Sequence, residues 1–139
     1  MKIAVSACLL GQNCKYNGGN NKNERVLAFV EGHEVVPICP ETAGGLSAPR
    51  LPAEIVGDRV VLSDGTDVTA AFRAGAARTL DTLQGEGVEL VILKARSPSC
   101  GNREIYDGTF GGRLIAGRGV TAEAILAAGY RVMNEEEIE

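Results

Sequence analysis

Residues 88–95, VELVILKA, are the clearest buried β-strand in this sequence, and the fold follows from them. Shorter apolar runs predict three more strands, at residues 2–7, 33–39 and 130–134. Helical patterns separate these strands, at residues 23–32, 67–87 and 121–129. Strands that alternate with helices are joined by right-handed crossovers and form parallel sheets. We therefore expect an α/β fold, an open and mostly parallel sheet with helices on both faces, Rossmann-like or flavodoxin-like.

Smaller features complete this expectation. Two β-branched runs in residues 53–65 predict a β-hairpin that turns at Gly57 and Asp58. Asp67 is the predicted N-cap of the first long helix, and Thr121 that of the last one. Residues 40–52 and 96–119 are rich in Gly, Pro and Ser and are expected to be loops.

Length and composition bound the function. The 139 residues predict a single domain, residues 1–139, and no run approaches the ~18 apolar residues of a membrane span. The first residues lack the features of a signal peptide, so we expect a cytoplasmic protein without a membrane partner. A net charge of −4 argues against extended nucleic-acid binding. The acidic end, residues 134–139, is interpreted as a solvated helix end.

Four cysteines follow the predicted strands. Cys8 and Cys14 come after the first strand, Cys39 ends the second, and Cys100 lies in the loop after residues 88–95. The carboxyl ends of parallel strands meet at one edge of the sheet, where such folds bind ligands. A cytosolic protein keeps its thiols reduced, which leaves metal binding, catalysis or packing as their use.

The cysteine spacing favours an iron–sulfur cluster over zinc but leaves both open. Paired C-x2-4-C knuckles of structural zinc sites are absent from the sequence. A cubane cluster held by only three thiolates keeps one iron open. The single histidine, His33, stands at the opposite end of its strand from Cys39, so acid–base work falls to other groups. Glu41, Ser97 and Ser99 lie close to cysteines in the sequence and are candidates for it.

Basic residues also lie near these motifs, and they leave room for a local basic pocket. They are Arg50, Lys94, Arg96 and Arg103.

Five motifs in fixed order resemble the domain-of-unknown-function-523 family. They are VSACLLGQNCKYNGGNN (5–21), PICPETAGGLSAPRLPAEI (37–55), GTDVTAAFRAGA (65–76), LKARSPSCGNREIYDGTFGG (93–112) and GRGVTAEAILAAGY (117–130). The resemblance covers nearly the whole chain. This family includes the iron–sulfur-dependent 2-thiouracil desulfurases, which carry an oxygen-sensitive 4Fe-4S cluster and release sulfur as sulfide from a thiolated pyrimidine.

The resemblance implies a 4Fe-4S cluster held by three ligands, Cys8, Cys39 and Cys100, with one open iron. Two alternatives stay open for Cys14, a fourth thiol near the cluster or a loop residue. A thiocarbonyl sulfur is soft and prefers iron to a hard oxygen donor, so the open iron would bind the substrate sulfur.

The resemblance also implies a non-redox desulfurase that acts on a small thiolated nucleobase such as 2-thiouracil. Glu41 would be the acid–base group, and Ser97 would orient the substrate or the attacking water. A non-catalytic alternative is a cluster- or metal-binding module, such as a sensor or a binder of sulfur ligands, which needs neither Glu41 nor Ser97. A zinc-bound structural domain is a further alternative. The sequence does not fix the physiological substrate.

Overall fold

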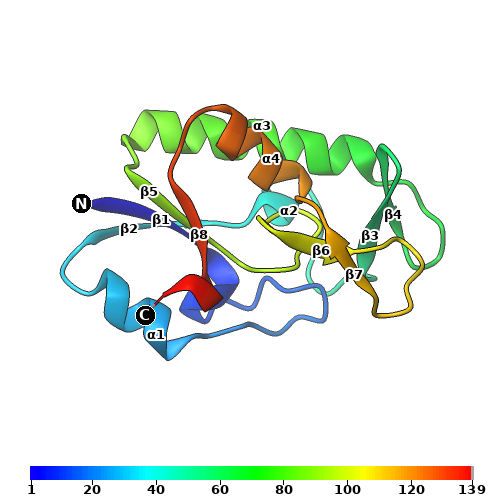
Figure 1. Ribbon diagram of the computed structural model, residues 1–139, viewed down its shortest axis with the longest axis horizontal. Helices are drawn as coiled ribbons and strands as arrows, with labels where there is room; N and C mark the ends of the chain where they lie inside the picture. The colour runs from blue at the N-terminus through cyan, green and yellow to red at the C-terminus, as the bar shows by residue number, and fades with distance from the viewer. Residues whose placement is uncertain (139) are drawn as a thin grey trace.

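The computed structural model describes residues 1–138, and it is built around one parallel sheet (Figure 1). Its strands are β1 (Lys2–Ser6), β2 (Glu34–Ile38), β5 (Leu90–Leu93) and β8 (Val132–Asn134). They lie in the order β2-β1-β5-β8, and each neighbouring pair is parallel. The fully buried strand β5 lies inside the sheet, as its apolar run predicts. The predicted α/β fold is confirmed.

Helices cover both faces of this sheet (Figure 1). Helix α1 (Glu24–Val30) packs on one face, while α3 (Thr69–Glu86) and α4 (Val120–Ala127) pack side by side on the other. Successive strand residues point to opposite faces, so Ile3 and Val5 join the core beneath α1 and Ala4 joins the other one. The parallel sheet is therefore held between two apolar layers, one beneath the helices of each face.

Both predicted helix caps are wrong. The N-cap of α3 is Val68, one residue after Asp67, although the Asp67 carboxylate still accepts a hydrogen bond from the Thr69 N–H (2.9 Å) and also contacts Arg59 Nε (2.8 Å). The N-cap of α4 is Gly119, and Thr121 lies buried within the first turn. The two predictions therefore miss the N-cap by one and by two residues.

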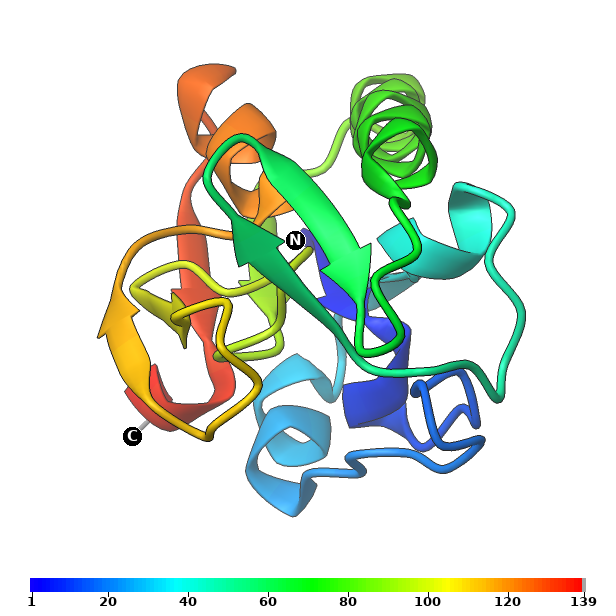
Figure 2. The ribbon, with the colours of Figure 1, turned by 90° about the vertical axis from the view of Figure 1, so that its right-hand side faces the viewer.

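Two hairpins extend beyond the sheet (Figure 2). Strands β3 (Ala53–Val56) and β4 (Arg59–Leu62) form the predicted hairpin, with Gly57 at φ +62° in its turn. The expected loop at residues 96–119 is wrong in part, since β6 (Glu104–Tyr106) and β7 (Leu114–Ala116) pair within it. These strands have three residues each and are mostly exposed, so no apolar alternation marks them.

Short helical turns occupy three further segments. They are η1 (Ala7–Leu10), α2 (Pro40–Ala43) and η2 (Glu135–Glu137). Helix α2 lies where the sequence predicts only loop. The interpretation of the acidic end as solvated holds for Glu136 but not for Glu135, whose side chain is only 10% exposed. Within residues 1–138, no helix combines the length and the apolar character that crossing a bilayer requires.

Candidate metal centre and active site

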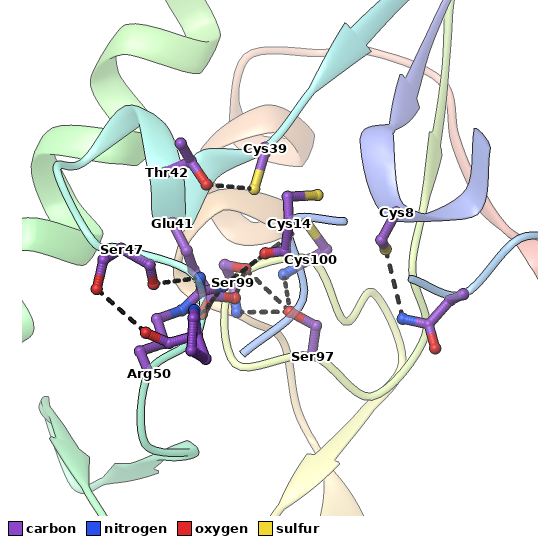
Figure 3. Close-up of polar contacts among 12 residues, drawn as sticks. Cys8, Cys14, Cys39, Glu41, Thr42, Ser47, Arg50, Ser97, Ser99 and Cys100 are labelled. Atoms are coloured by element: carbon purple, nitrogen blue, oxygen red, sulfur yellow. Dashed lines mark hydrogen bonds and ion pairs between the residues drawn. The ribbon is translucent and has the colours of Figure 1, made fainter. Parts of the chain in front are cut away.

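The carboxyl ends of β1, β2 and β5 open into a cavity of about 540 Å³ that all four cysteines line. Cys8 lies in η1, Cys39 is the N-cap of α2, and Cys100 lies in the turn after β5. Cys14 enters from the loop that follows η1, and all four thiols are free (Figure 3). The predicted convergence of the thiols at one sheet edge is confirmed.

Burial raises the pKa of the Cys8, Cys14 and Cys100 thiols and so makes them weaker acids in the absence of a metal. Cys100 is only 4% exposed, and burial raises its pKa to about 12. Burial also raises the pKa of Cys14 to about 12, with the Cys39 thiol beside it, and raises the pKa of Cys8. Metal binding requires thiolates, so a bound metal must displace these protons and supply the compensating charge.

The donor set fits a cluster better than a single ion. Among residues 1–138, no three His, Cys, Asp or Glu side chains converge closely enough to hold one metal ion. The four thiols instead surround a cavity of several hundred Å³ from separate loops. A four-iron cluster spans thiolates that are farther apart than the ligands of one zinc ion, and soft thiolates are its usual ligands. The residues present therefore fit a 4Fe-4S cluster.

Glu41 projects from the first turn of α2 and is held by Arg50. Arg50 Nε and Nη2 both donate to Glu41 Oε1, at 3.2 and 3.1 Å. The same guanidinium donates to the carbonyl oxygens of Ser47 (2.8 Å) and Cys14 (3.1 Å). One arginine therefore fixes the carboxylate relative to two loops of the cavity wall.

A chain of hydroxyls reaches the other oxygen of Glu41 (Figure 3). Ser99 Oγ donates to Glu41 Oε2 at 2.8 Å and lies 2.9 Å from Ser97 Oγ. Because the single hydroxyl hydrogen of Ser99 points to the carboxylate, Ser97 must donate to Ser99. Ser97 Oγ also accepts from the N–H groups of Ser99 (3.1 Å) and Cys100 (3.0 Å). Glu41 and Ser97 thus belong to one connected network.

Helix α4 holds the turn that carries Cys100. The N–H groups of Val120 and Thr121 donate to the carbonyl oxygens of Pro98 and Ser99, both at 2.9 Å. Gly119 permits this approach, because a Cβ at Gly119 would lie 2.5 Å from the Ser99 carbonyl carbon. The thiol and both serines are therefore positioned by the start of a helix.

The basic residues do not form an open basic pocket. Each of the four pairs with a carboxylate, at 3.1 Å for Arg50–Glu41, 3.0 Å for Lys94–Glu135, 2.8 Å for Arg96–Glu136 and 3.8 Å for Arg103–Glu137. Glu135 additionally accepts from the Ala95 N–H at 2.7 Å, next to the cavity wall.

Sequence reasoning missed two members of the site. It did not connect Arg50 with Glu41, and it did not consider Glu54, which lines the cavity from β3. No local motif marks either residue. His33 lies outside the site, exposed before the opposite end of β2.

Comparisons with known proteins agree with this geometry. Residues 3–137 match the family described as 2-thiouracil desulfurase. The uncharacterized protein YbbK of Bacillus subtilis strain 168 is 44% identical over 146 aligned residues, which cover 98% of this chain and 97% of that protein. The solved structure of a 4Fe-4S-dependent thiouracil desulfidase, TudS of the DUF523 family, superposes with a TM-score of 0.91 at 42% identity. It matches 99% of this chain and 92% of that one. This chain therefore belongs to the 2-thiouracil desulfurase family.

Proposed function

We propose that this protein is an iron–sulfur-dependent enzyme that removes sulfur, as sulfide, from a thiolated nucleobase such as 2-thiouracil in the cytoplasm. One observation carries the proposal: free thiols from three strand ends and the Glu41 network line one cavity. Its relatives include a 4Fe-4S-dependent thiouracil desulfidase. The net reaction is hydrolytic, since the carbon–sulfur double bond is exchanged for a carbon–oxygen double bond. Water supplies the new oxygen and both protons of the hydrogen sulfide that leaves.

Cys8, Cys39 and Cys100 would hold the cluster, and Cys14 would remain a free thiol beside it. When bound, the cluster would offer one open iron as a Lewis acid for the soft sulfur of the substrate. The chain supports this placement by two contacts to the thiols. Asn21 Nδ2 donates to Cys8 Sγ at 3.5 Å, and Cys39 Sγ lies 3.1 Å from Thr42 Oγ1.

Glu41 would act as the acid–base group, through one defined atom. Two nitrogens of Arg50 donate to Oε1, whereas Oε2 accepts only the Ser99 hydroxyl from the described part of the chain and keeps a second lone pair. Water held at that lone pair would give its proton to Oε2 as it attacks the thiocarbonyl carbon. Ser97 lines the same cavity, and because its hydrogen and both lone pairs are used within the chain, it would orient the substrate or the water through Ser99 and Glu41.

Anaerobic reconstitution tests the cluster. We expect about four irons per chain, loss of iron in Cys8→Ser, Cys39→Ser and Cys100→Ser, and retention in Cys14→Ser. A reconstituted wild-type protein without iron contradicts the proposal.

Sulfide release from 2-thiouracil, with uracil as the second product, tests the activity. Glu41→Gln should keep its iron and lose turnover by about 100-fold or more, because a positioned acid–base group contributes that much. Iron-loaded protein that releases no sulfide from a panel of thiolated bases would instead favour a non-catalytic cluster-binding module. Unchanged turnover in Glu41→Gln would remove this residue from the reaction.

A further inference from the structure

Glu54 is a buried carboxylate in the wall of the same cavity, and the proposed mechanism leaves it unused. It lies in β3, is 9% exposed and lines the cavity. Its Oε1 accepts hydrogen bonds from the N–H groups of Gly108 (2.9 Å) and Phe110 (3.2 Å). These bonds fasten the turn between β6 and β7 to β3, which contacts β6 (Figure 2).

These two hydrogen bonds do not explain why the side chain at position 54 is a carboxylate. Both N–H groups donate to Oε1. Within residues 1–138, no Lys, Arg or His side chain forms an ion pair with Glu54, and no group donates a hydrogen bond to its Oε2. A neutral glutamine would fasten the turn equally well through its side-chain carbonyl. Oε2 is not among the fully buried side-chain atoms that lack a partner, so it stays accessible. Because Glu54 lines the cavity, this free acceptor is available to a donor supplied by a ligand.

We propose that Glu54 Oε2 accepts a hydrogen bond from a ring N–H next to the thiocarbonyl carbon of the substrate. This inference rests on the proposed function. The thiocarbonyl carbon of 2-thiouracil carries an N–H on each side, and a hydrogen bond to an ionised acceptor is strong. Glu54 thereby selects thiolated bases whose ring nitrogen is unsubstituted, because an N-alkylated analogue leaves the carboxylate without its donor.

The charges of the cavity wall agree with such a substrate. Glu41 and Glu54 both face the cavity, while Arg50, Lys94 and Arg96 are already paired with carboxylates. The arrangement suits an uncharged ring with N–H donors rather than a phosphorylated nucleotide.

The test compares two substrates in the iron-loaded wild type and in Glu54→Gln. The substrates are 2-thiouracil and 1,3-dimethyl-2-thiouracil, which has no ring N–H. In Glu54→Gln the side-chain oxygen keeps the turn fastened and the amide nitrogen, a donor only, faces the cavity. The wild-type ratio of kcat/KM between the two substrates should fall by about tenfold to hundredfold in Glu54→Gln, as expected for one lost charged hydrogen bond.

A steric effect of the methyl groups is the same in both proteins and therefore cancels in this comparison. Glu89→Gln, which removes an exposed carboxylate outside the cavity, is the matched control and should keep the wild-type ratio. A Glu54→Gln ratio within twofold of wild type overturns the proposal. If Glu54→Gln does not fold, Glu54→Asp serves instead, since the shorter side chain withdraws the oxygen from the ligand and should lower the same ratio.

Calorimetric binding of uracil and of 1,3-dimethyluracil tests the contact without turnover. Glu54→Gln should weaken uracil binding by about tenfold or more and leave the affinity for dimethyluracil unchanged; equal losses for both ligands overturn the proposal. Wild-type protein that releases no sulfide from 2-thiouracil refutes the proposed function, and the binding comparison still decides the role of Glu54.

Discussion

The Arg50 guanidinium and the Glu41 carboxylate form an ion pair in which two nitrogens of one residue contact a single oxygen of the other. The side chains are only 8% and 16% exposed. Water screens such a pair weakly, and removal of either residue would leave the other charge largely buried and without compensation. The same guanidinium binds the carbonyl oxygen of Cys14, so this pair also fixes the loop that follows η1.

Arg50→Ala is expected to lower the free energy of unfolding by about 3 kcal/mol, because it leaves a largely buried carboxylate without its cation. Urea denaturation measures this loss. Arg50→Lys should lose less, since it restores the charge without the planar set of donors. The double variant with Glu41→Gln should recover part of the loss because no charge then stays unpaired. An Arg50→Ala midpoint equal to that of wild type would contradict a structural role for the pair.

Ser99→Ala is expected to lower kcat by about tenfold to hundredfold, because it removes the hydrogen bond that orients Glu41 Oε2. KM should change less than kcat, since Ser99 is only 2% exposed and its hydroxyl hydrogen is donated to Glu41. The exposed Ser63→Ala is the matched control and should leave both constants unchanged. Steady-state kinetics and iron analysis check the result. Loss of iron in Ser99→Ala would show that the hydroxyl serves the Cys100 turn instead of Glu41.

The sheet and the convergence of the thiols were predictable because both follow from short-range patterns. An apolar run such as Leu90–Leu93 marks a buried strand, and parallel strands present their carboxyl ends at one edge. Cys39 and Cys100 could therefore be placed together although 61 positions separate them.

The polar contacts of the site were not predictable because they join distant segments. Glu54 bonds to N–H groups 54 and 56 positions away, and Glu135 bonds to an N–H 40 positions away. No periodicity or spacing encodes such pairs. The two caps were missed by one and by two residues, because local patterns place helix ends only to within that distance; Asp67 keeps its bond to the Thr69 N–H beside its contact with Arg59.

Stability at acid pH should depend on Glu137 in the C-terminal segment. Hydrogen bonds from Asn102 Nδ2 and the Asn134 N–H, both at 3.0 Å, hold the pKa of Glu137 below its ordinary value of 4.5. A lowered folded-state pKa stabilises the protein above the unfolded-state value, and the contribution disappears as pH falls through the folded-state value.

Glu137→Gln should therefore be less stable than wild type at pH 7, by about 1 kcal/mol or less for this partly exposed group. The difference should shrink as pH falls below about 4.5. Urea denaturation over a pH series measures it. A difference that does not change with pH would show that the carboxylate charge contributes nothing.

Two glycines let α2 and α3 touch through their backbones. A Cβ on Gly75 would collide with the carbonyl oxygen of Pro40, and a Cβ on Gly44 would collide with that of Ala71. Cys39 is the N-cap of α2 and Glu41 lies in its first turn, so this contact sets the position of both.

Gly75→Ala is expected to push α2 away from α3, at a cost of about 1–3 kcal/mol for overpacking, and to lower the iron content and turnover of reconstituted protein. Gly85→Ala lies in the same helix with no heavy atom within 4 Å of the added carbon, and it is the matched control. It should raise the free energy of unfolding by about 0.5–1 kcal/mol, because alanine is the better helix former. Urea denaturation and iron analysis of both variants decide the matter: if Gly75→Ala also gains stability and keeps its iron, the backbone contact does not position Cys39 and Glu41.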